Sequence, residues 1–259
     1  MTNQTTASRN PADQYELVAD EYDMSFRLMP VRGHIEAYSV LRHAGDVTGL
    51  RVLDVACGTG FYARAMRRAG AARVVGIDLS EAMIEVARSA EKATELGIDY
   101  HVADASALER IGSFDLALCV YLLHYAPSTE ALRAMCGRLA DNLAPGGRLV
   151  AFSMNPEVAT EKGAYQAYGL VLRVPDPEPN GCPIHFSIQA PGFSSPEMLA
   201  YRWNRDTYEA ALRDAGFEQI GWHRPEVSPK GVEEHGSGMW GDYLARPHCM
   251  LLSATKASA

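Results

Sequence analysis

The chain has 259 residues, of which 47% are hydrophobic and 22% are charged, a composition typical of a globular protein built on one large domain. Its net charge of −8 and its lack of a basic stripe disfavour a nucleic-acid substrate, and no apolar run approaches the ~20 residues of a membrane span. The five cysteines are scattered and odd in number, without a CxxC pair, which predicts reduced thiols in a cytoplasmic enzyme.

Two helices are predicted before residue 50. The first covers residues 13–23, where Tyr15 and Tyr22 fall among apolar residues at helical spacing. The second covers residues 34–44, and Gly45 ends it. The residues between them, Phe26 to Pro30, are expected to form a connector.

A strand–helix–strand unit follows. The buried strand Val52–Val55 leads into a turn that contains Gly58 and Gly60, and a helix over Phe61–Arg68 precedes a second strand that ends at Asp78. Asp54 lies at the end of the first strand, so each strand ends near a carboxylate. Ligands of open α/β sheets bind beyond these carboxyl ends, which predicts a binding site there.

Two nucleotide cofactors are compatible with this unit. The run Gly58–Ala63 satisfies the G-x-G-x-x-G/A dinucleotide pattern, with Asp78 placed for a ribose. Asp54 argues against a dinucleotide, because a carboxylate just before the loop would repel a pyrophosphate. S-adenosylmethionine (SAM) carries an ammonium and a sulfonium but no phosphate, so the sequence favours SAM.

The string Val52–Gly60 closely resembles motif I of the class I SAM-dependent methyltransferases, with Ala56 in place of that family's first glycine. Asp78 resembles the motif II acid that holds the ribose hydroxyls. Asp104 matches the motif III acid, which reads the adenine amino edge together with the adjacent backbone amide. The resemblance implies an α/β, Rossmann-like methyltransferase fold, with a seven-stranded, mostly parallel sheet, helices on both faces and an inserted substrate cap.

The same resemblance implies which residues bind SAM or its product S-adenosylhomocysteine. Tyr22 would cover the methionyl end, since residues 19–23 resemble the lid segment of many small-molecule methyltransferases; a core tyrosine is the alternative. Leu79 and Met83 would flank the adenine, although Met83 equally fits a plain core position. The predicted cofactor contacts are Tyr22, Asp54, Ala56, Gly58, Gly60, Asp78, Leu79, Met83, Asp104, Ala105 and Val120.

The remaining elements continue the alternation of helices and strands. Ser80 is a good N-cap for the next helix, and the run Leu143–Leu149 is typical of the same superfamily. The final strand is expected to be antiparallel. Helices are predicted over residues 81–96, 129–142 and 207–215, and strands over residues 98–102, 114–121, 143–152, 217–223 and 248–254.

The composition shifts after the fifth strand, where prolines cluster and helical periodicity is lost. Short strand-like runs remain at residues 183–189 and 198–203. Long insertions of this kind are usually functional, so a substrate cap is expected here. The predicted parts are N-terminal lid helices (1–49), a SAM-binding core (50–153), the cap insertion (154–205) and the C-terminal part of the core (206–259).

Methyl transfer needs mainly proximity and alignment, worth up to about 7–11 kcal/mol, because the sulfonium already activates the methyl group. His124 and Tyr121, after the fourth strand, are the catalytic candidates. His124 is a candidate base, since an imidazole titrates near neutrality, or else a packed or substrate-orienting histidine. Candidate substrate contacts are Tyr15, Tyr125, His185 and Trp203. No metal is expected, because the histidines considered show no ligand spacing.

Three runs, Phe26–Pro30, Val120–Tyr125 and Trp222–Gly231, resemble the toxoflavin-biosynthesis type of methyltransferase. That group N-methylates small, flat heterocycles, so the resemblance implies a ring nitrogen of a small planar natural-product intermediate as the acceptor. The alternatives are O-methylation of a small phenolic or carboxylate metabolite, an NAD-dependent oxidoreductase, and a SAM-binding protein that does not methylate. The sequence does not indicate an oligomeric state.

The choice of cofactor gives the first prediction. Calorimetry should show binding of SAM and S-adenosylhomocysteine and no heat from NAD or NADP, because Asp54 makes the loop unsuitable for a pyrophosphate. Tight NAD binding without SAM binding would contradict it.

Overall fold

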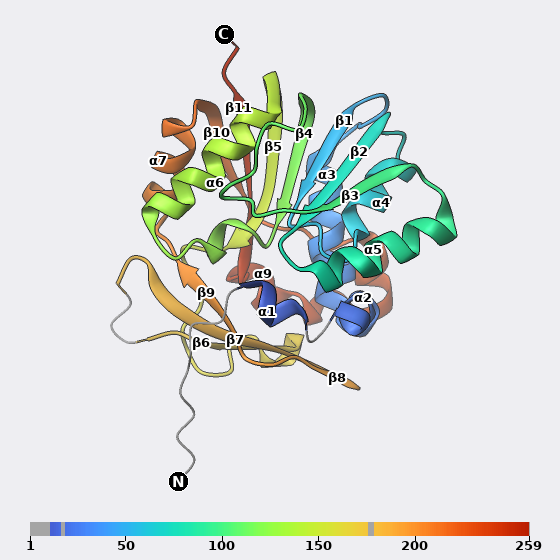
Figure 1. Cartoon of the computed structure of the whole chain (residues 1–259). Helices are drawn as coiled ribbons and strands as arrows, with labels where there is room; N and C mark the ends of the chain where they lie inside the picture. Colours follow the sequence, from blue (N-terminus) through green and yellow to red (C-terminus); the bar gives the residue numbers. More distant parts are fainter. Residues whose placement is uncertain (1–10, 17–18, 176–178, 259) are drawn as a thin grey trace.

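The computed structural model of the chain describes residues 11–16, 19–175 and 179–258 (Figure 1). A large twisted sheet lies beside a small antiparallel sheet, and the N-terminal helices approach both of them. All five cysteines are buried free thiols. Within the described ranges, no helix combines the length and the apolar composition that a membrane crossing requires.

The large sheet has seven strands in the order β10-β11-β5-β4-β1-β2-β3. All neighbouring pairs are parallel except the two pairs that β11 makes, with β5 and with β10. This is the predicted fold, including its antiparallel last strand. The strands are β1 (Arg51–Val55), β2 (Arg73–Asp78), β3 (Ile98–Val102), β4 (Phe114–Val120), β5 (Leu143–Met154), β10 (Phe217–His223) and β11 (Cys249–Lys256).

Both faces of this sheet are buried, and alternate side chains serve opposite faces. On β4, Ala117 and Cys119 pack toward α6 (Thr129–Asn142) and α7 (Arg205–Asp214), whereas Leu116 and Leu118 pack toward the opposite layer. That layer contains α3 (Tyr38–Ala44), α4 (Phe61–Arg68) and α5 (Glu81–Thr94). The order of strands reverses at β1, between β2 and β4, which is where ligands of such sheets bind.

The N-terminal helices differ most from the sequence prediction. The helix predicted over residues 13–23 is two helices, α1 (Pro11–Glu16) and α2 (Ala19–Leu28), with residues 17–18 outside the described ranges. The predicted connector is therefore largely helical up to Leu28, and the break falls at Met29 because a residue before proline disfavours helix. The next helix opens with a π-helical segment, η1 (Arg32–Ala37), before α3.

The small sheet lies in the predicted cap region. Its central strand β7 (Cys182–Ala190) pairs antiparallel with β6 (Leu170–Arg173), β8 (Phe193–Ser194) and β9 (Met198–Arg202). The strand-like runs at 183–189 and 198–203 are confirmed as strands. Short 3₁₀ turns occur at η2 (Leu123–Tyr125) and η3 (Gln166–Tyr168).

The chain between β10 and β11 forms short helices that the sequence patterns did not predict: α8 (Pro229–His235), η4 (Ser237–Met239) and α9 (Gly241–Ala245). This segment runs against the N-terminal helices, where the Ser228 N–H donates to the His34 carbonyl at 2.7 Å. Trp240 and Tyr243 pack into the apolar cluster that includes cap residues. The predicted boundaries of the four parts stay predictions.

Candidate active site

The loop between β1 and α4 is held in an unusual backbone conformation. Ala56, Gly58 and Gly60 all have positive φ angles, of 62°, 53° and 82°. An L-residue such as Ala56 pays roughly 1–2 kcal/mol in this left-handed region, which explains why glycine is the residue expected there. At Gly60 a Cβ would also overlap the ring of Tyr100, with only 2.8 Å to its Cζ.

Asp78 ties this loop to the end of β2. One carboxylate oxygen accepts the Gly58 N–H at 2.8 Å, and the other accepts the Ser80 N–H at 2.9 Å. Burial raises the pKa of the Asp78 carboxyl above its ordinary value, while these backbone donors and that of Leu79 act against the rise. Each oxygen keeps a further lone pair, so the carboxylate can still accept hydroxyl groups of a ligand.

Asp54 lies beneath the loop and is only 1% exposed. Neither of its oxygens has a well-formed hydrogen bond, and burial raises its pKa to about 7 despite the nearby backbone N–H of Ala63. Asp54 and Gly60 do not line the cavity described next. Their contact with a cofactor therefore stays a prediction.

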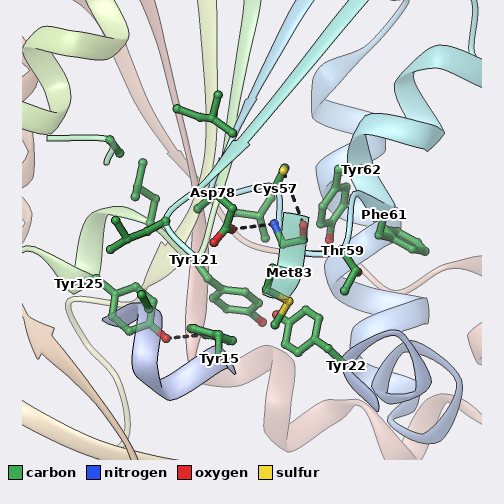
Figure 2. A pocket seen from close by; sticks show the side chains of 18 of the residues that line it. Tyr15, Tyr22, Cys57, Thr59, Phe61, Tyr62, Asp78, Met83, Tyr121 and Tyr125 are labelled. Carbon is green, nitrogen blue, oxygen red and sulfur yellow. Dashed lines mark hydrogen bonds between the residues drawn. The ribbon is translucent and has the colours of Figure 1, made fainter. Parts of the chain in front are cut away.

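A cavity of about 910 Å³, part of it open to solvent, lies over this loop and the ends of β1, β2 and β4; we call it the loop-side cavity (Figure 2). Nine of the eleven predicted cofactor residues line it: Tyr22, Ala56, Gly58, Asp78, Leu79, Met83, Asp104, Ala105 and Val120. Asp78 and Asp104 bring carboxylates to its wall, as a ligand with ribose hydroxyls and an adenine amino group requires.

A second cavity of about 540 Å³, part of it open to solvent, lies between the first and the small sheet of the predicted cap; we call it the cap-side cavity. Inward-facing residues of β6 and β7 contribute apolar wall, namely Leu170, Leu172, Phe186 and Ile188. Tyr15, Tyr22, Arg32 and Tyr121 line both cavities, so the two adjoin at these side chains.

The helix α2, the predicted lid, is fastened to the loop beside Tyr22. The Asp23 carboxylate accepts hydrogen bonds from the Thr59 hydroxyl and, at 3.0 Å, from Arg64. The Tyr22 hydroxyl accepts a hydrogen bond from Arg32 at 3.1 Å. The placement of Tyr22 over the cavity is therefore fixed by its own contacts and by those of the next residue.

A buried ion pair lies beside the two cavities, and its Arg32 lines both of them. Arg32 is 3% exposed and Glu36 is fully buried, with 3.2 Å between the Arg32 Nε and the Glu36 Oε2. The hydroxyls of Tyr62 and Tyr121 also donate to the Glu36 carboxylate, at 2.9 and 2.7 Å. Sequence reasoning missed this pair: its signal was two opposite charges four residues apart, which more often marks an exposed helix face.

His124 is buried and neutral. Its Nδ1 accepts the Met154 N–H at 3.3 Å and lies 3.0 Å from the Ser153 hydroxyl, so the ring proton is on Nε2. Burial lowers its pKa to about 3. His124 lines the cap-side cavity, and its protonation state there suits a hydrogen-bond donor better than a base.

Tyr121 occupies the junction of the two cavities. Its φ of 60° is uncommon for an aromatic residue and marks local backbone strain of the kind found at functional sites. Its hydroxyl donates to Glu36 and lies 3.4 Å from the His248 Nε2. Burial lowers the pKa of His248 to about 3, so this neighbour is also neutral.

The four predicted substrate contacts are placed differently. The Tyr15 and Tyr125 hydroxyls are 2.6 Å apart beside the loop-side cavity. His185 and Trp203 line neither cavity, and their contact with a substrate stays a prediction. On β7 the cavity takes Phe186, so the adjacent His185 falls on the other face, 3.3 Å from Glu197. Trp203 is buried in the core and donates to the Ala126 carbonyl at 3.1 Å.

Comparison with known proteins agrees with this geometry. A family model described as a methyltransferase domain matches residues 52–147. A ubiquinone biosynthesis O-methyltransferase from Bordetella bronchiseptica is 31% identical over 188 residues, covering 72% of this chain and 69% of that protein. A protein of the same description from Xanthomonas oryzae pv. oryzae is 38% identical over 112 residues, 42% of this chain. This match spans 45% of the Xanthomonas protein's length.

Among solved structures, a putative S-adenosylmethionine-dependent methyltransferase from Listeria monocytogenes has the same fold. The superposition has a TM-score of 0.64 at 24% identity and covers 86% of this chain and 97% of the other.

The strain at Ala56 and the close contact at Gly60 predict opposite effects of reciprocal substitutions. Gly60→Ala should lower the melting temperature and abolish SAM binding, because the added methyl group collides with Tyr100. Ala56→Gly should keep binding and lose little stability, since relief of ~1 kcal/mol of strain offsets the entropy cost of glycine. Thermal unfolding and calorimetry measure both; unimpaired SAM binding by Gly60→Ala would contradict this account of the loop.

Asp78→Ala should weaken SAM binding by about 1.5–3 kcal/mol, the usual scale for hydrogen bonds to a charged group. The loss includes the hydrogen bonds to the ligand and the anchoring of Gly58. Calorimetric titration measures it, with Asp99→Ala on the exposed side of β3 as the control. An unchanged affinity of the Asp78 variant would show that this carboxylate does not hold the cofactor.

Proposed function

The chain belongs to the class I SAM-dependent methyltransferases, and on this premise we propose that it transfers the methyl group of SAM to a ring nitrogen of a small planar heterocycle. The observation that carries the proposal is the cap-side cavity, which adjoins the predicted SAM site and has largely apolar and aromatic walls. The resemblance of three sequence runs to the toxoflavin-biosynthesis type supports a heterocyclic acceptor. The cytoplasmic location and the absence of a nucleic-acid partner remain part of the proposal.

The two cavities divide the work. When bound in the loop-side cavity, SAM supplies a methyl group activated by its sulfonium. The acceptor lies in the cap-side cavity, and the two ligands meet beside Tyr22, Arg32 and Tyr121, which line both. The protein holds the two reactants in line and keeps water away from the junction, which are the main contributions such a transfer requires.

The charges of the cap-side cavity favour a neutral acceptor. Arg32 is the one permanent cation among the described residues that line it, and Glu36 balances its charge within 3.2 Å. His124 and His248 are neutral at physiological pH, because burial lowers the pKa of each to about 3. An anionic acceptor would find no unbalanced positive charge among these groups.

A neutral nitrogen heterocycle matches the remaining polar groups. With its proton on Nε2, His124 donates one directional hydrogen bond to a ring nitrogen or carbonyl, while Phe186 and the tyrosines clamp the faces of the ring. A ring nitrogen attacks with an in-plane lone pair and needs little help from a base. His124 thus acts by orientation.

O-methylation of a small phenol is the second candidate. The Bordetella relative is named as an O-methyltransferase, and the site contains a route for the proton that a phenol must lose. The phenol hydroxyl passes its proton to the Tyr121 oxygen as Tyr121 passes its own proton to the Glu36 Oε2, 2.7 Å away. SAM loses one positive charge when it becomes S-adenosylhomocysteine, and Glu36 loses one negative charge when it gains the proton. The net charge of the buried site is therefore unchanged.

The test is to incubate the protein with SAM and separate panels of azaheterocycles and phenols, and to detect the mass of one added methyl group by mass spectrometry. Methylation of azaheterocycles supports the proposal. Methylation of phenols alone favours the second candidate. SAM binding without turnover of either panel would point to a SAM-binding protein that does not methylate.

His124→Ala should lower kcat by a factor nearer ~10² than ~10⁴, the lower end of the range for general-base loss, because a histidine with a pKa of about 3 orients the acceptor and does not deprotonate it. Steady-state kinetics on the best azaheterocycle measure the effect, with His101→Ala on β3 as a control. Complete inactivity of His124→Ala, together with turnover of phenols only, would contradict the N-methylation proposal.

A further inference from the structure

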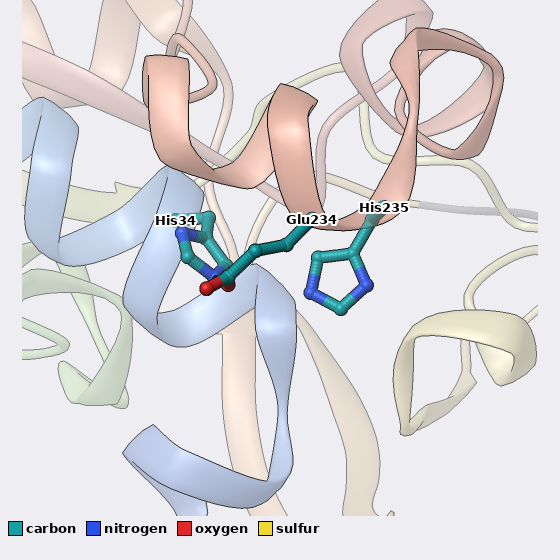
Figure 3. Close-up of side chains that lie close together, drawn as sticks. All are labelled: His34, Glu234 and His235. Carbon is teal, nitrogen blue, oxygen red and sulfur yellow. The ribbon is translucent and has the colours of Figure 1, made fainter.

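Three side chains that can ligate a metal ion lie close together outside both cavities. His34 on η1 faces Glu234 and His235 at the end of α8, and one ligand atom from each lies within 4.8 Å of the others (Figure 3). We propose that these three residues bind a divalent transition-metal ion, best matched by zinc, which ties α8 to η1.

The donor set selects the class of metal. Two imidazoles and one carboxylate suit zinc and its first-row neighbours, which accept nitrogen ligands. Magnesium and calcium prefer oxygen ligands. Three protein ligands leave a fourth position of a tetrahedral zinc ion to water.

His34 is fixed in place before any ion binds. Its Nδ1 lies 3.0 Å from the Ser228 hydroxyl, and its carbonyl accepts the Ser228 N–H. Gly231 lets the two helices touch, because a Cβ there would come within 2.7 Å of the His34 Cβ. The ring of His34 is therefore held between η1 and the first turn of α8.

The contact of His34 with Glu234 needs a proton or a cation between the two atoms. The His34 Nε2 and the Glu234 Oε2 are 3.2 Å apart, and two lone pairs do not meet at this distance without a proton or a cation between them. A metal ion is the alternative to the proton. His34 then carries its proton on Nδ1 and donates it to Ser228, the arrangement in which metal-bound histidines are usually supported.

The other two ligands have room to close around an ion. Glu234 and His235 are exposed, so their side chains rotate at little cost. Such rotation is needed, because the ligand atoms are up to 4.8 Å apart and bonds to zinc are ~2 Å long. Glu234 also contacts Lys230 at 3.4 Å, but an exposed ion pair of this kind is weak. Trp240, buried below, packs against both imidazole rings, with centroid distances of 6.2 Å to His34 and 5.6 Å to His235.

The position of this cluster gives the ion a structural role. On η1, His34 lies between Arg32 and Glu36, whose side chains turn to the buried network at the two cavities. A zinc ion would fasten the segment that contains α8 to the helix that carries this network. It does not touch either cavity, so the ion is not a participant in methyl transfer.

Zinc binding to the untagged protein provides the test. Calorimetry should show one zinc ion per chain, and saturating zinc should raise the melting temperature by about 5 °C or more, as expected for a ligand at ~100 times its Kd in a domain of this size. Magnesium should cause no shift. Absence of zinc binding by the parent protein would overturn the proposal.

Matched variants locate the site. Glu234→Gln and His235→Gln should each weaken zinc binding by at least ~10-fold, since even outer-shell partners of metal ligands are worth that much. Glu233→Gln, which removes the neighbouring charge, and His101→Gln on β3 should bind zinc as the parent does. Equal zinc affinity in all four variants, or equal loss in the controls, would place the ion elsewhere and overturn the proposal.

Discussion

The buried Arg32–Glu36 pair is the interaction on which the arrangement of the site depends. Two charges out of water are tolerated only when they are paired and hydrogen-bonded, and the partners of this pair come from the whole surroundings. Tyr22 belongs to the lid, Tyr62 to α4 and Tyr121 to the end of β4. Satisfying one ion pair thus fixes α2, α4 and the end of β4 relative to one another.

The glycine loop is clamped from two sides in the same way. Asp78 receives the Gly58 N–H from the sheet side, and Asp23 receives the Thr59 hydroxyl from the lid. The first contact shapes the loop for its ligand, and the second brings Tyr22 over it (Figure 2). The contacts of Asp23 with Thr59 and Arg64 therefore hold α2 and Tyr22 against the loop.

The sequence predicts those features that are specified by residues close together in the chain. The strand–loop–helix from Val52 to Arg68 and the acid at Asp78 are specified by neighbours along the chain, and both the fold and the cavity wall were predictable from them. Asp54 has the right residue type at the right spacing, but its distance from the cavity depends on the turn at Ala56, which only the three-dimensional backbone reveals.

The residues that sequence patterns could not place depend on long-range packing. Arg32 and Glu36 sit on a π-helical segment, whose altered periodicity redirects side chains in a way no helical pattern anticipates. His185 was assigned by its presence in the cap, yet the alternation of β7 decides which neighbour faces inward, and the register comes from pairing with β6 and β9. Trp203 follows β9 directly, but its side chain is buried in the core beside α7. The residue type alone does not show on which side of the chain such a ring packs.

The division between sheet core and cap also explains why the cofactor is easier to assign than the acceptor. The match to the methyltransferase family model ends at residue 147, before the cap begins. Inward positions of β6 and β7 pack in a cluster separate from the two that stabilise the large sheet. Because substitutions there reshape the cap-side cavity without disturbing either face of that sheet, the proposed acceptor site can change while the fold is kept. Similarity in the core therefore identifies the cofactor, whereas the proposed acceptor site depends on the inward face of β7, which the family model does not cover.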